Sequence, residues 1–322
     1  MDQVPVIDIS ALFSGEGRQE CVAKIGHACR EIGFLSISGT GVDPGLAGAL
    51  REEIRALFAL SEARKFAGAI TRENYRGFIP FGLFSANDGS GTADNYEGFK
   101  LHWECPVDDP VMAECRLYGP NLWPEERPQL RTLTLQYWAE LDRVGAALLG
   151  AIEESLGLPA GAITSLFKKP MTNMTMLHYP PQAPDERGFG IHPHKDTDAL
   201  TIISPDPVGG LEVLTKADGW HEVSCPDGGF IVNIGDMLEL WSGGHLVSTP
   251  HRVINRSGKD RISFPFFMVP RHNVVVQPLV SVRDGFDRPE VHTGHWSAET
   301  WRTNWPDETA DEDTPELGTV HS

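Results

Sequence analysis

The chain has 322 residues, 40% of them hydrophobic and 22% charged, which is typical of a globular protein with one large domain, or with one core and helical additions. Its 45 acidic and 27 basic residues give a formal net charge of -18, so a polyanionic backbone would be repelled and nucleic acid is a poor partner. The five scattered cysteines form no CxxC pair, and the sequence shows neither a signal peptide nor a run of about 18 apolar residues, so we expect a cytoplasmic protein with reduced thiols and no membrane span.

The first third of the chain predicts a strand and two helices, followed by irregular structure. Residues 4–9 (VPVIDI) form a short apolar run that predicts a strand. Apolar residues recur at helical spacing over residues 19–32, before the breaker Gly33, and a second helix is predicted over residues 44–60. Residues 71–120 are rich in Gly, Asn, Asp and aromatics without a clear period, which indicates loops and short strands of the kind that often carry binding function.

The rest of the chain predicts one long helix and then a β-rich region. Apolar residues recur at spacings of three and four over residues 127–156, and GLPAG ends this helix. Turn sequences then separate short β-like runs over residues 171–270, namely MTMLHY, ALTIIS, GLEVL, GGFIVNI, MLELW and ISFPFFMV. Such a series predicts an antiparallel sandwich or barrel. From about Trp296 we expect a surface helix followed by a disordered acidic tail.

The motif HKD in the β-rich region has the spacing of a metal site. Side chains at positions i and i+2 of a strand point to the same face, so His194 and Asp196 can offer an imidazole nitrogen and a carboxylate oxygen to one ion. His251, at the start of another predicted strand, is the candidate third ligand. A lone histidine is more often a surface or core residue, but two histidines and one carboxylate on one face of an octahedron leave three positions open, which suits iron(II) and oxygen activation.

A cation and a hydroxyl follow at the same i and i+2 spacing, in Arg261 and Ser263. Arg261 lies in a run otherwise dense with apolar residues, so its guanidinium needs an anionic partner. A dicarboxylate co-substrate could provide that partner, because the guanidinium can bind a carboxylate through two parallel hydrogen bonds. The alternative is a structural ion pair with an Asp or Glu.

Several motifs occur in an order and spacing that resemble a known family. HKDTDALTII, HRV and RIS are similar to the corresponding motifs of the iron(II) and 2-oxoglutarate-dependent oxygenases of the isopenicillin N synthase-like family. The similarity extends over most of the chain, from VPVIDIS through NYRGF, LHYPP and GDMLELWSGG to STPHRV. It implies a mainly β fold with flanking helices, in which a double-stranded β-helix (jelly-roll) core carries an N-terminal helical lobe.

The resemblance also implies roles for particular residues. His194, Asp196 and His251 would be ligands of Fe(II), and Arg261 and Ser263 would hold the distal carboxylate of 2-oxoglutarate. Tyr179, in the Tyr-Pro position of the family, would lend its hydroxyl to the same carboxylate. The implied reaction consumes O2 and 2-oxoglutarate, releases succinate and carbon dioxide, and oxidises a C–H bond of a small organic substrate. Hydroxylation, desaturation, ring formation and ring expansion all remain open.

The sequence departs from the family pattern at two positions. Leu177 stands where members with the fuller NYYP pattern carry Asn, so one polar contact near the co-substrate is missing or replaced. Asp198 stands where many members carry Gly, and we interpret it as a solvated turn residue, with a hydrogen-bond acceptor beside the metal ligands as the alternative. His192 and His245 lie near the motifs but do not match its ligand positions, so we expect neither to bind the metal.

Substrate contacts are expected from the irregular region 71–105, from the strand before the metal motif and from the C-terminal segment. An apolar pocket lined by aromatic residues would suit a small organic molecule, although the same residues could simply pack the N-terminal lobe against the barrel. Arg76 could meet an acidic substrate or cap a helix. The candidates are Tyr75, Arg76, Phe78, Phe81, Phe84, Phe99, His102 and Trp103.

Two alternatives to this function remain at the level of the sequence. Isopenicillin N synthase and the plant ethylene-producing oxidase use the same ligands without 2-oxoglutarate, so the Arg-x-Ser pair indicates an anion site but not its occupant. A zinc-loaded or non-catalytic barrel that binds a ligand is the second alternative. We divide the chain into an N-terminal helical and loop region (1–120), a support helix with the jelly-roll core (121–290) and a C-terminal segment with an acidic tail (291–322); the oligomeric state is left open.

Overall fold

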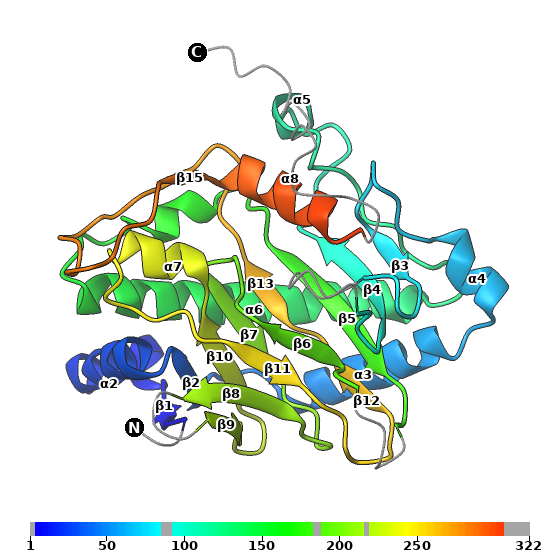
Figure 1. Cartoon of the computed structure of the whole chain (residues 1–322), viewed down its shortest axis with the longest axis horizontal. Coiled ribbons are helices and arrows are strands. Elements are labelled where there is room, and N and C mark those ends of the chain that lie inside the picture. Colours follow the sequence, from blue (N-terminus) through cyan, green and yellow to red (C-terminus); the bar gives the residue numbers. More distant parts are fainter. Residues whose placement is uncertain (1–3, 85–91, 183–187, 216–218, 306–322) are drawn as a thin grey trace.

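The computed structural model describes residues 4–84, 92–182, 188–215 and 219–305. Figure 1 shows two facing groups of strands with the long helix α6 behind them and helix α8 across one end. The elements, in chain order, are β1 (Val6–Asp8), α1 (Ala11–Ser14), α2 (Arg18–Glu31), β2 (Phe34–Ser38), α3 (Pro44–Phe58), α4 (Glu62–Ala67), β3 (Gly77–Ile79), β4 (Glu97–His102), α5 (Val111–Glu114), α6 (Pro128–Ser155), the 3-10 turn η1 (Thr164–Phe167), β5 (Asn173–Tyr179), β6 (Ile191–His194), β7 (Leu200–Ile203), β8 (Leu211–Thr215), β9 (Gly219–Glu222), β10 (Phe230–Ile234), α7 (Asp236–Trp241), β11 (His251–Val253), β12 (Arg261–Ser263), β13 (Phe266–Met268), β14 (Val275–Val276), β15 (Val291–His292) and α8 (Thr293–Thr303).

Two sheets enclose the interior of the molecule. Within the described ranges, the larger sheet has nine strands in the order β1-β2-β10-β7-β13-β5-β4-β3, with β12 also paired to β5. The smaller sheet, β6-β11-β8-β9, lies in front of it (Figure 1). Apart from the parallel β1–β2 pair, the neighbouring strands are antiparallel. This arrangement confirms the predicted mainly β fold with a jelly-roll core and flanking helices.

Strands from the N-terminal region extend the larger sheet at both edges. β1 and β2 add to β10 at one edge, and β4 and β3 add to β5 at the other. The larger sheet is therefore built from the first third of the chain as well as from the core strands. The division of the chain into three segments stays a prediction.

Helices α2, α3 and α6 cover the outer face of the larger sheet. Helix α6 begins at Pro128, where the missing N–H of proline costs no helical hydrogen bond, and it buries Tyr137, Trp138 and Leu141 along one face. The Tyr137 and Trp138 rings meet Phe264 and Phe266 edge-on, at 5.3 and 4.9 Å between centroids. These contacts fix the sheet against a rigid helical layer and leave its inner face toward the smaller sheet.

One predicted β run is wrong. The segment MLELW forms most of helix α7, because the backbone N–H groups of Asp236 and Met237 donate to the carbonyl oxygens of Asp196 and Asp198 and turn the chain away from the strand direction. Its apolar side chains are buried on every side, and a short run of that kind has no period that separates helix from strand. The turn also fixes the backbone beside Asp196.

The C-terminal part of the chain departs from the sequence-based prediction in two further ways. The run ISFPFFMV is divided into β12 and β13 at Pro265, which has no N–H for a sheet hydrogen bond. The predicted C-terminal helix is present as α8, but it is not a plain surface helix, because the Trp301 ring stacks on Tyr75 at 4.7 Å. The predicted acidic tail lies outside the described residues. None of the described helices is long and apolar enough to cross a membrane.

Candidate functional site

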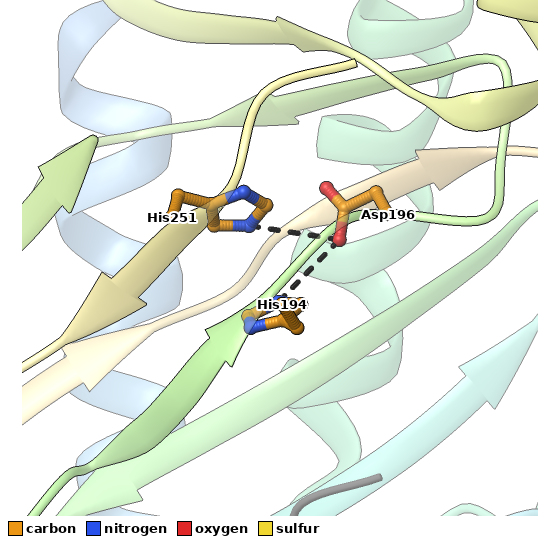
Figure 2. Close-up of side chains that lie close together, drawn as sticks. All are labelled: His194, Asp196 and His251. Carbon is orange, nitrogen blue, oxygen red and sulfur yellow. Dashed lines mark ion pairs between the residues drawn. The ribbon is translucent and has the colours of Figure 1, made fainter. Parts of the chain in front are cut away.

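The two histidines of the candidate metal site face each other across a strand pair. His194 is the last residue of β6, His251 is the first residue of β11, and the antiparallel register places them directly opposite each other. Asp196 lies two residues past the end of β6, so the expected i and i+2 pair on one strand is corrected to a strand end followed by a loop. Figure 2 shows the three side chains converging on one point between the sheets.

The geometry of this cluster suits one small cation. The Nε2 atoms of His194 and His251 each lie 3.6 Å from Oδ1 of Asp196, and the three ligand atoms all lie within 4.8 Å of one another. The Nδ1 atom of His194 is 2.7 Å from the carbonyl oxygen of His192, and that of His251 is 3.3 Å from the carbonyl oxygen of Thr249. Protons on both Nδ1 atoms leave both Nε2 lone pairs free for a metal.

Two buried donors orient the carboxylate of Asp196. Thr201 on β7 and Asn233 on β10 donate to Oδ2 at 2.6 and 2.7 Å, so Oδ1 is the oxygen that faces the histidines. Burial opposes ionisation of this carboxyl group, but the charge of His251, the hydrogen bond and charge of His194 and the Thr201 hydroxyl hold its pKa well below the usual range. Asp196 is therefore an anion at neutral pH. Both donors were missed in the sequence, where neither stands out from its strand.

The protonation of the histidines follows from their surroundings. Burial lowers the pKa of His251 to about 4, against the opposing charge of Asp196, so its imidazole is neutral near pH 7 and able to act as a ligand. Burial also disfavours the charged form of His194, but the hydrogen bond and charge of Asp196 raise its pKa above the ordinary value. A metal cation in the cluster would replace the proton on His194 as the positive charge beside Asp196.

The interpretation of Asp198 as a solvated turn residue is wrong. Its side chain is 3% exposed, and Oδ2 accepts a hydrogen bond from Thr201 at 3.0 Å. Burial raises the pKa of its carboxyl group well above the ordinary value, and the charge of Asp196 adds to that rise. The Thr201 hydroxyl has one hydrogen to share between the carboxyl groups of Asp196 and Asp198, and the alternative interpretation of Asp198 as an acceptor beside the ligands agrees with this contact.

Arg261, Tyr179 and Ser263 lie together on the inner face of the larger sheet. The β12–β5 register pairs Arg261 with Tyr179 and Ser263 with Leu177. The Arg261 guanidinium lies 4.8 Å over the Tyr179 ring, and its Nε donates to the carbonyl oxygen of Gly209 at 2.6 Å. Its Nη1 is buried without a hydrogen-bond partner, and within the described chain Arg261 forms no ion pair with an Asp or Glu. This orphaned donor fits a carboxylate ligand.

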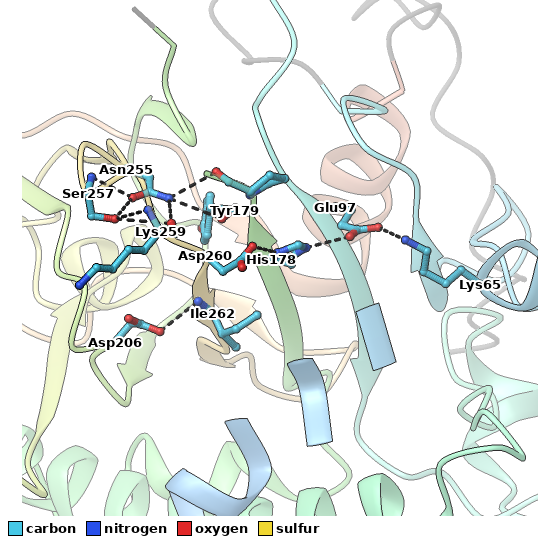
Figure 3. A network of polar contacts seen from close by, with 11 residues as sticks. Lys65, Glu97, His178, Tyr179, Asp206, Asn255, Ser257, Lys259, Asp260 and Ile262 are labelled. Atoms are coloured by element: carbon cyan, nitrogen blue, oxygen red, sulfur yellow. Dashed lines mark hydrogen bonds and ion pairs between the residues drawn. The ribbon is translucent and has the colours of Figure 1, made fainter. Parts of the chain in front are cut away.

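A chain of polar contacts holds β12 in place beside this site (Figure 3). Asp206 accepts a hydrogen bond from the backbone N–H of Ile262 at 3.0 Å. His178 bridges Asp260 and Glu97, at 2.8 Å from each, and Lys65 reaches Glu97 at 2.6 Å. Arg261 is therefore flanked on both sides by residues that are fixed to other strands or loops.

The histidines that were expected not to be ligands lie outside the cluster. The Nδ1 atom of His192 is 2.6 Å from Oδ1 of Asp94, and His245 contacts the carbonyl oxygen of Ser281 at 2.9 Å. His192 nevertheless lines the cavity that contains the cluster.

A cavity of about 500 Å³ opens beside the three candidate ligands. Its volume is in the range of small-molecule sites. Aromatic side chains form one part of its wall, and polar side chains from β4, β5 and α8 form another. The lining residues used below are Tyr75, Phe84, Lys100, Asn173, Phe267, Trp301 and Asn304.

The structure brings only some of the predicted substrate residues to this cavity. Tyr75 and Phe84 line it, while Phe78 and Phe99 are core residues and Phe81 is 55% exposed. The wrong assignments arose because composition marks an aromatic-rich segment but not the face on which each ring lies.

The polar candidates are also corrected. Arg76 is buried and donates to the carbonyl oxygen of Leu117 at 2.8 Å, so it neither meets the cavity nor caps a helix. His102 and Trp103 line a separate cavity of about 180 Å³. Lys100, two residues before His102, does line the main cavity and was missed, because no strand was assigned at residues 97–102 from which its face could have been inferred.

Comparison with known proteins agrees with this geometry. Residues 171–270 match the family model described as the 2OG-Fe(II) oxygenase superfamily, and residues 4–126 match the N-terminal model of a non-haem dioxygenase in morphine synthesis. A probable iron/ascorbate oxidoreductase of Dictyostelium discoideum is 33% identical over 85% of this chain and 83% of its own length.

Solved structures share the fold. A putative 2OG-Fe(II) oxygenase family protein from Caulobacter crescentus superposes with a TM-score of 0.81 at 26% identity, covering 93% of this chain and 98% of its own. JOX2, determined in complex with 2OG, Fe and JA, gives a TM-score of 0.78 at 27% identity over 94% of this chain and 86% of its own.

Proposed function

Because the chain belongs to the 2OG-Fe(II) oxygenase superfamily and is a non-haem Fe(II) and 2-oxoglutarate-dependent dioxygenase, we propose that it oxidises a C–H bond of a small organic molecule held in the 500 Å³ cavity beside His194, Asp196 and His251. The single observation that carries this proposal is the position of that cavity, which shares its wall with the metal cluster. We place the reaction in specialised metabolism and the protein in the cytoplasm, and the five free cysteines support the latter.

His194, Asp196 and His251 are proposed as the Fe(II) ligands. The donor set of two imidazole nitrogens and one carboxylate oxygen is the one that leaves open positions on iron(II). The backbone carbonyls behind both imidazoles, and Thr201 and Asn233 behind the carboxylate, would hold each ligand atom in position before a metal arrives.

Arg261, Ser263 and Tyr179 are proposed to hold the distal carboxylate of 2-oxoglutarate. The buried Nη1 of Arg261 needs an acceptor, and Ser263 lies on the same face of β12. Leu177 faces Ser263 where members with the fuller NYYP pattern carry Asn, so we expect the anion to be held by Arg261, Ser263 and Tyr179 without a contact from that position.

The residues of this chain position the reactants and exclude water, while the iron and the co-substrate, when bound, supply the oxidant that attacks an unactivated C–H bond, with succinate and carbon dioxide as products. Tyr75, Phe84 and Trp301 supply apolar surface for the substrate. The stacked pair of Tyr75 and Trp301 closes one side of the cavity, which protects a reactive centre from water. Which bond lies nearest the metal decides between hydroxylation, desaturation and ring chemistry.

Succinate release tests the proposal directly. The anaerobically purified protein, loaded with Fe(II), is expected to convert 2-oxoglutarate to succinate with O2 uptake, and a metabolite mixture containing the substrate should accelerate that release. Oxygen uptake that depends on iron but is unchanged when 2-oxoglutarate is omitted would support the isopenicillin N synthase type of oxidase instead.

Metal analysis of the same preparation addresses the remaining alternative. We expect Fe(II) to bind stoichiometrically and to support oxygen consumption. Stoichiometric zinc that iron cannot replace, together with no oxygen consumption, would indicate a zinc-loaded or non-catalytic barrel.

A further inference from the structure

Lys100 is a cation on the wall of the substrate cavity whose role the metal and co-substrate sites do not explain. It lies in β4, directly opposite Thr175 of β5. Its neighbours Phe99 and Leu101 point to the buried core behind the sheet, so Lys100 points to the inner face that also carries Tyr179. The inner face thus has Arg261 and Tyr179 toward one end and Lys100 toward the other.

The contacts of Lys100 leave its charge without a partner. Its Nζ donates to Oδ1 of Asn173 at 2.6 Å and to Oγ1 of Thr175 at 2.9 Å, and both acceptors are neutral. Over the part of the chain that the structure describes, no Asp or Glu oxygen lies within 4.0 Å of it. The ammonium has three donors, so one remains for a ligand.

The other lysine that lines the cavity has an acidic partner, unlike Lys100. Lys195 also lines the cavity, but it is paired with Glu239 at 3.7 Å. Burial lowers the pKa of the Lys100 ammonium to about 7, against the charges of Asp196 and Asp198. An anion placed beside Nζ would favour the charged form and relieve the cost of burying it.

Aromatic rings surround the Lys100 ammonium, so the site combines a charged group with an apolar surface. The Phe267 ring lies 5.3 Å from Nζ and the Tyr75 ring 6.0 Å, within reach of weak cation–π contacts. Trp301, which also lines the cavity, stacks on Tyr75. An apolar or aromatic body would therefore rest on these rings while its acidic group reached Nζ.

We propose that Lys100 is a specificity-determining residue that binds a carboxylate of the primary substrate, so that the enzyme oxidises a small organic acid with an apolar body. This inference rests on the proposed function and specifies its substrate class. Asn173 and Thr175 position the ammonium, and the cavity is polar at Lys100 and aromatic around it.

Calorimetric titration with matched acids and amides tests the proposal. The anaerobic full-length protein, with Fe(II) and saturating 2-oxoglutarate so that Arg261 is occupied, is titrated with phenylacetate, 3-phenylpropionate and 4-phenylbutyrate and with the primary amide of each. We expect at least one acid to bind more tightly than its amide. Lys100→Met should weaken that acid by about 10- to 100-fold and leave the amide within about twofold, since hydrogen bonds to charged groups contribute about 1.5–3 kcal/mol.

Control variants distinguish binding of the substrate carboxylate by Lys100 from a purely structural role of this residue. Lys24→Met removes an exposed positive charge far from the cavity and should leave the preference for the acid unchanged, and Lys100→Arg should retain part of it. The affinity for 2-oxoglutarate and the melting temperature report whether each variant is folded. If Lys100→Met does not fold, Lys100→Arg and Lys100→Gln take its place.

The outcomes that overturn the proposal are equally specific. They are a wild-type protein that prefers no acid over its amide, a Lys100→Met protein that keeps the preference, and an equal loss of acid and amide. The failure of the proposed function would look different, because the wild-type protein would then show no binding when it is titrated with 2-oxoglutarate before the acids are added.

Discussion

The metal and co-substrate end of the interior differs from the substrate end in how its residues come together. His194, His251, Arg261 and Tyr179 lie in short motifs on adjacent strands, and strand register places each beside its partner. At the substrate end, the Tyr75 and Trp301 rings stack although they come from a loop before β3 and from helix α8. The first end depends on pairing within sheets, and the second depends on packing between distant segments.

This difference indicates which parts can vary independently. The metal end is fixed by buried hydrogen bonds, such as those from Thr201 and Asn233 to Asp196, and a change there leaves a buried polar group unpaired. The substrate end is held by stacked rings and one helix, where replacement of a ring costs contact area and little else. We therefore expect changes at the two ends to have separable effects.

The largest effect is expected from loss of a proposed metal ligand. Asp196→Ala should lower succinate production by more than about 100-fold, because removing even a hydrogen-bond partner of a metal ligand costs about 10- to 100-fold. Fe(II) titration measures the loss of metal affinity, and succinate assays measure the loss of turnover. His245→Ala, which removes a histidine outside the cluster, is the matched control and should be active. Near wild-type turnover of Asp196→Ala would show that the ligands are misassigned.

Arg261→Ala should have the next largest effect, and a selective one. Loss of a charge-assisted contact is expected to raise the KM for 2-oxoglutarate by about 10- to 100-fold, with a smaller change in kcat. Arg256→Ala removes an exposed arginine paired with Glu212 and should leave this KM unchanged. An unchanged KM in Arg261→Ala would point to a structural arginine or to one that binds the primary substrate.

Trp301→Ala tests whether the substrate end is separable. It should lower the free energy of unfolding by about 1–3 kcal/mol, since it removes the stack on Tyr75, while the KM for 2-oxoglutarate stays within about twofold. Binding of the matched acids described above should weaken. Phe81→Ala, at a ring that is 55% exposed, is the control and should alter neither quantity. A large rise in the KM for 2-oxoglutarate in Trp301→Ala would contradict the separation of the two ends.

The smallest expected effect concerns the outer support of the co-substrate end. Burial opposes the charge on His178, but its hydrogen bonds to Glu97 and Asp260 raise its pKa above the ordinary value (Figure 3). A raised pKa in the folded state stabilises the protein below the unfolded pKa, and this contribution is lost as pH rises through the folded pKa. His178→Gln should therefore destabilise the protein more at about pH 6 than at about pH 9, by about 1–2 kcal/mol.

Denaturant unfolding of both proteins at the two pH values measures this difference. Replacement of His27, an exposed histidine of helix α2, by Gln serves as the control and should show no such pH dependence. An equal loss of stability for His178→Gln at both pH values would mean that His178 acts through packing, for example against Phe58, whose ring stacks on it at 5.4 Å.

Sequence patterns located the strands and the metal motif, but they did not determine side-chain burial. MTMLHY is a short β-like run bounded by turns and the helical period before GLPAG is regular, and both elements form as predicted. MLELW was misassigned because a fully buried run carries no period. Asp198 was misassigned because nothing in its neighbours along the chain reports the Thr201 hydroxyl that reaches it.

The sequence by itself determined the chemistry that the chain can carry, because the donor atoms of His194, Asp196 and His251 and the guanidinium of Arg261 are properties of residue types in recognisable motifs. Only the tertiary structure decided what lies beside that chemistry. It brought Lys100 and Trp301 to one cavity and turned Arg76 and Phe99 away from it. The physical reason is that a cavity wall is made by the packing of segments distant in the chain, and the local pattern of one segment does not say which face another will cover.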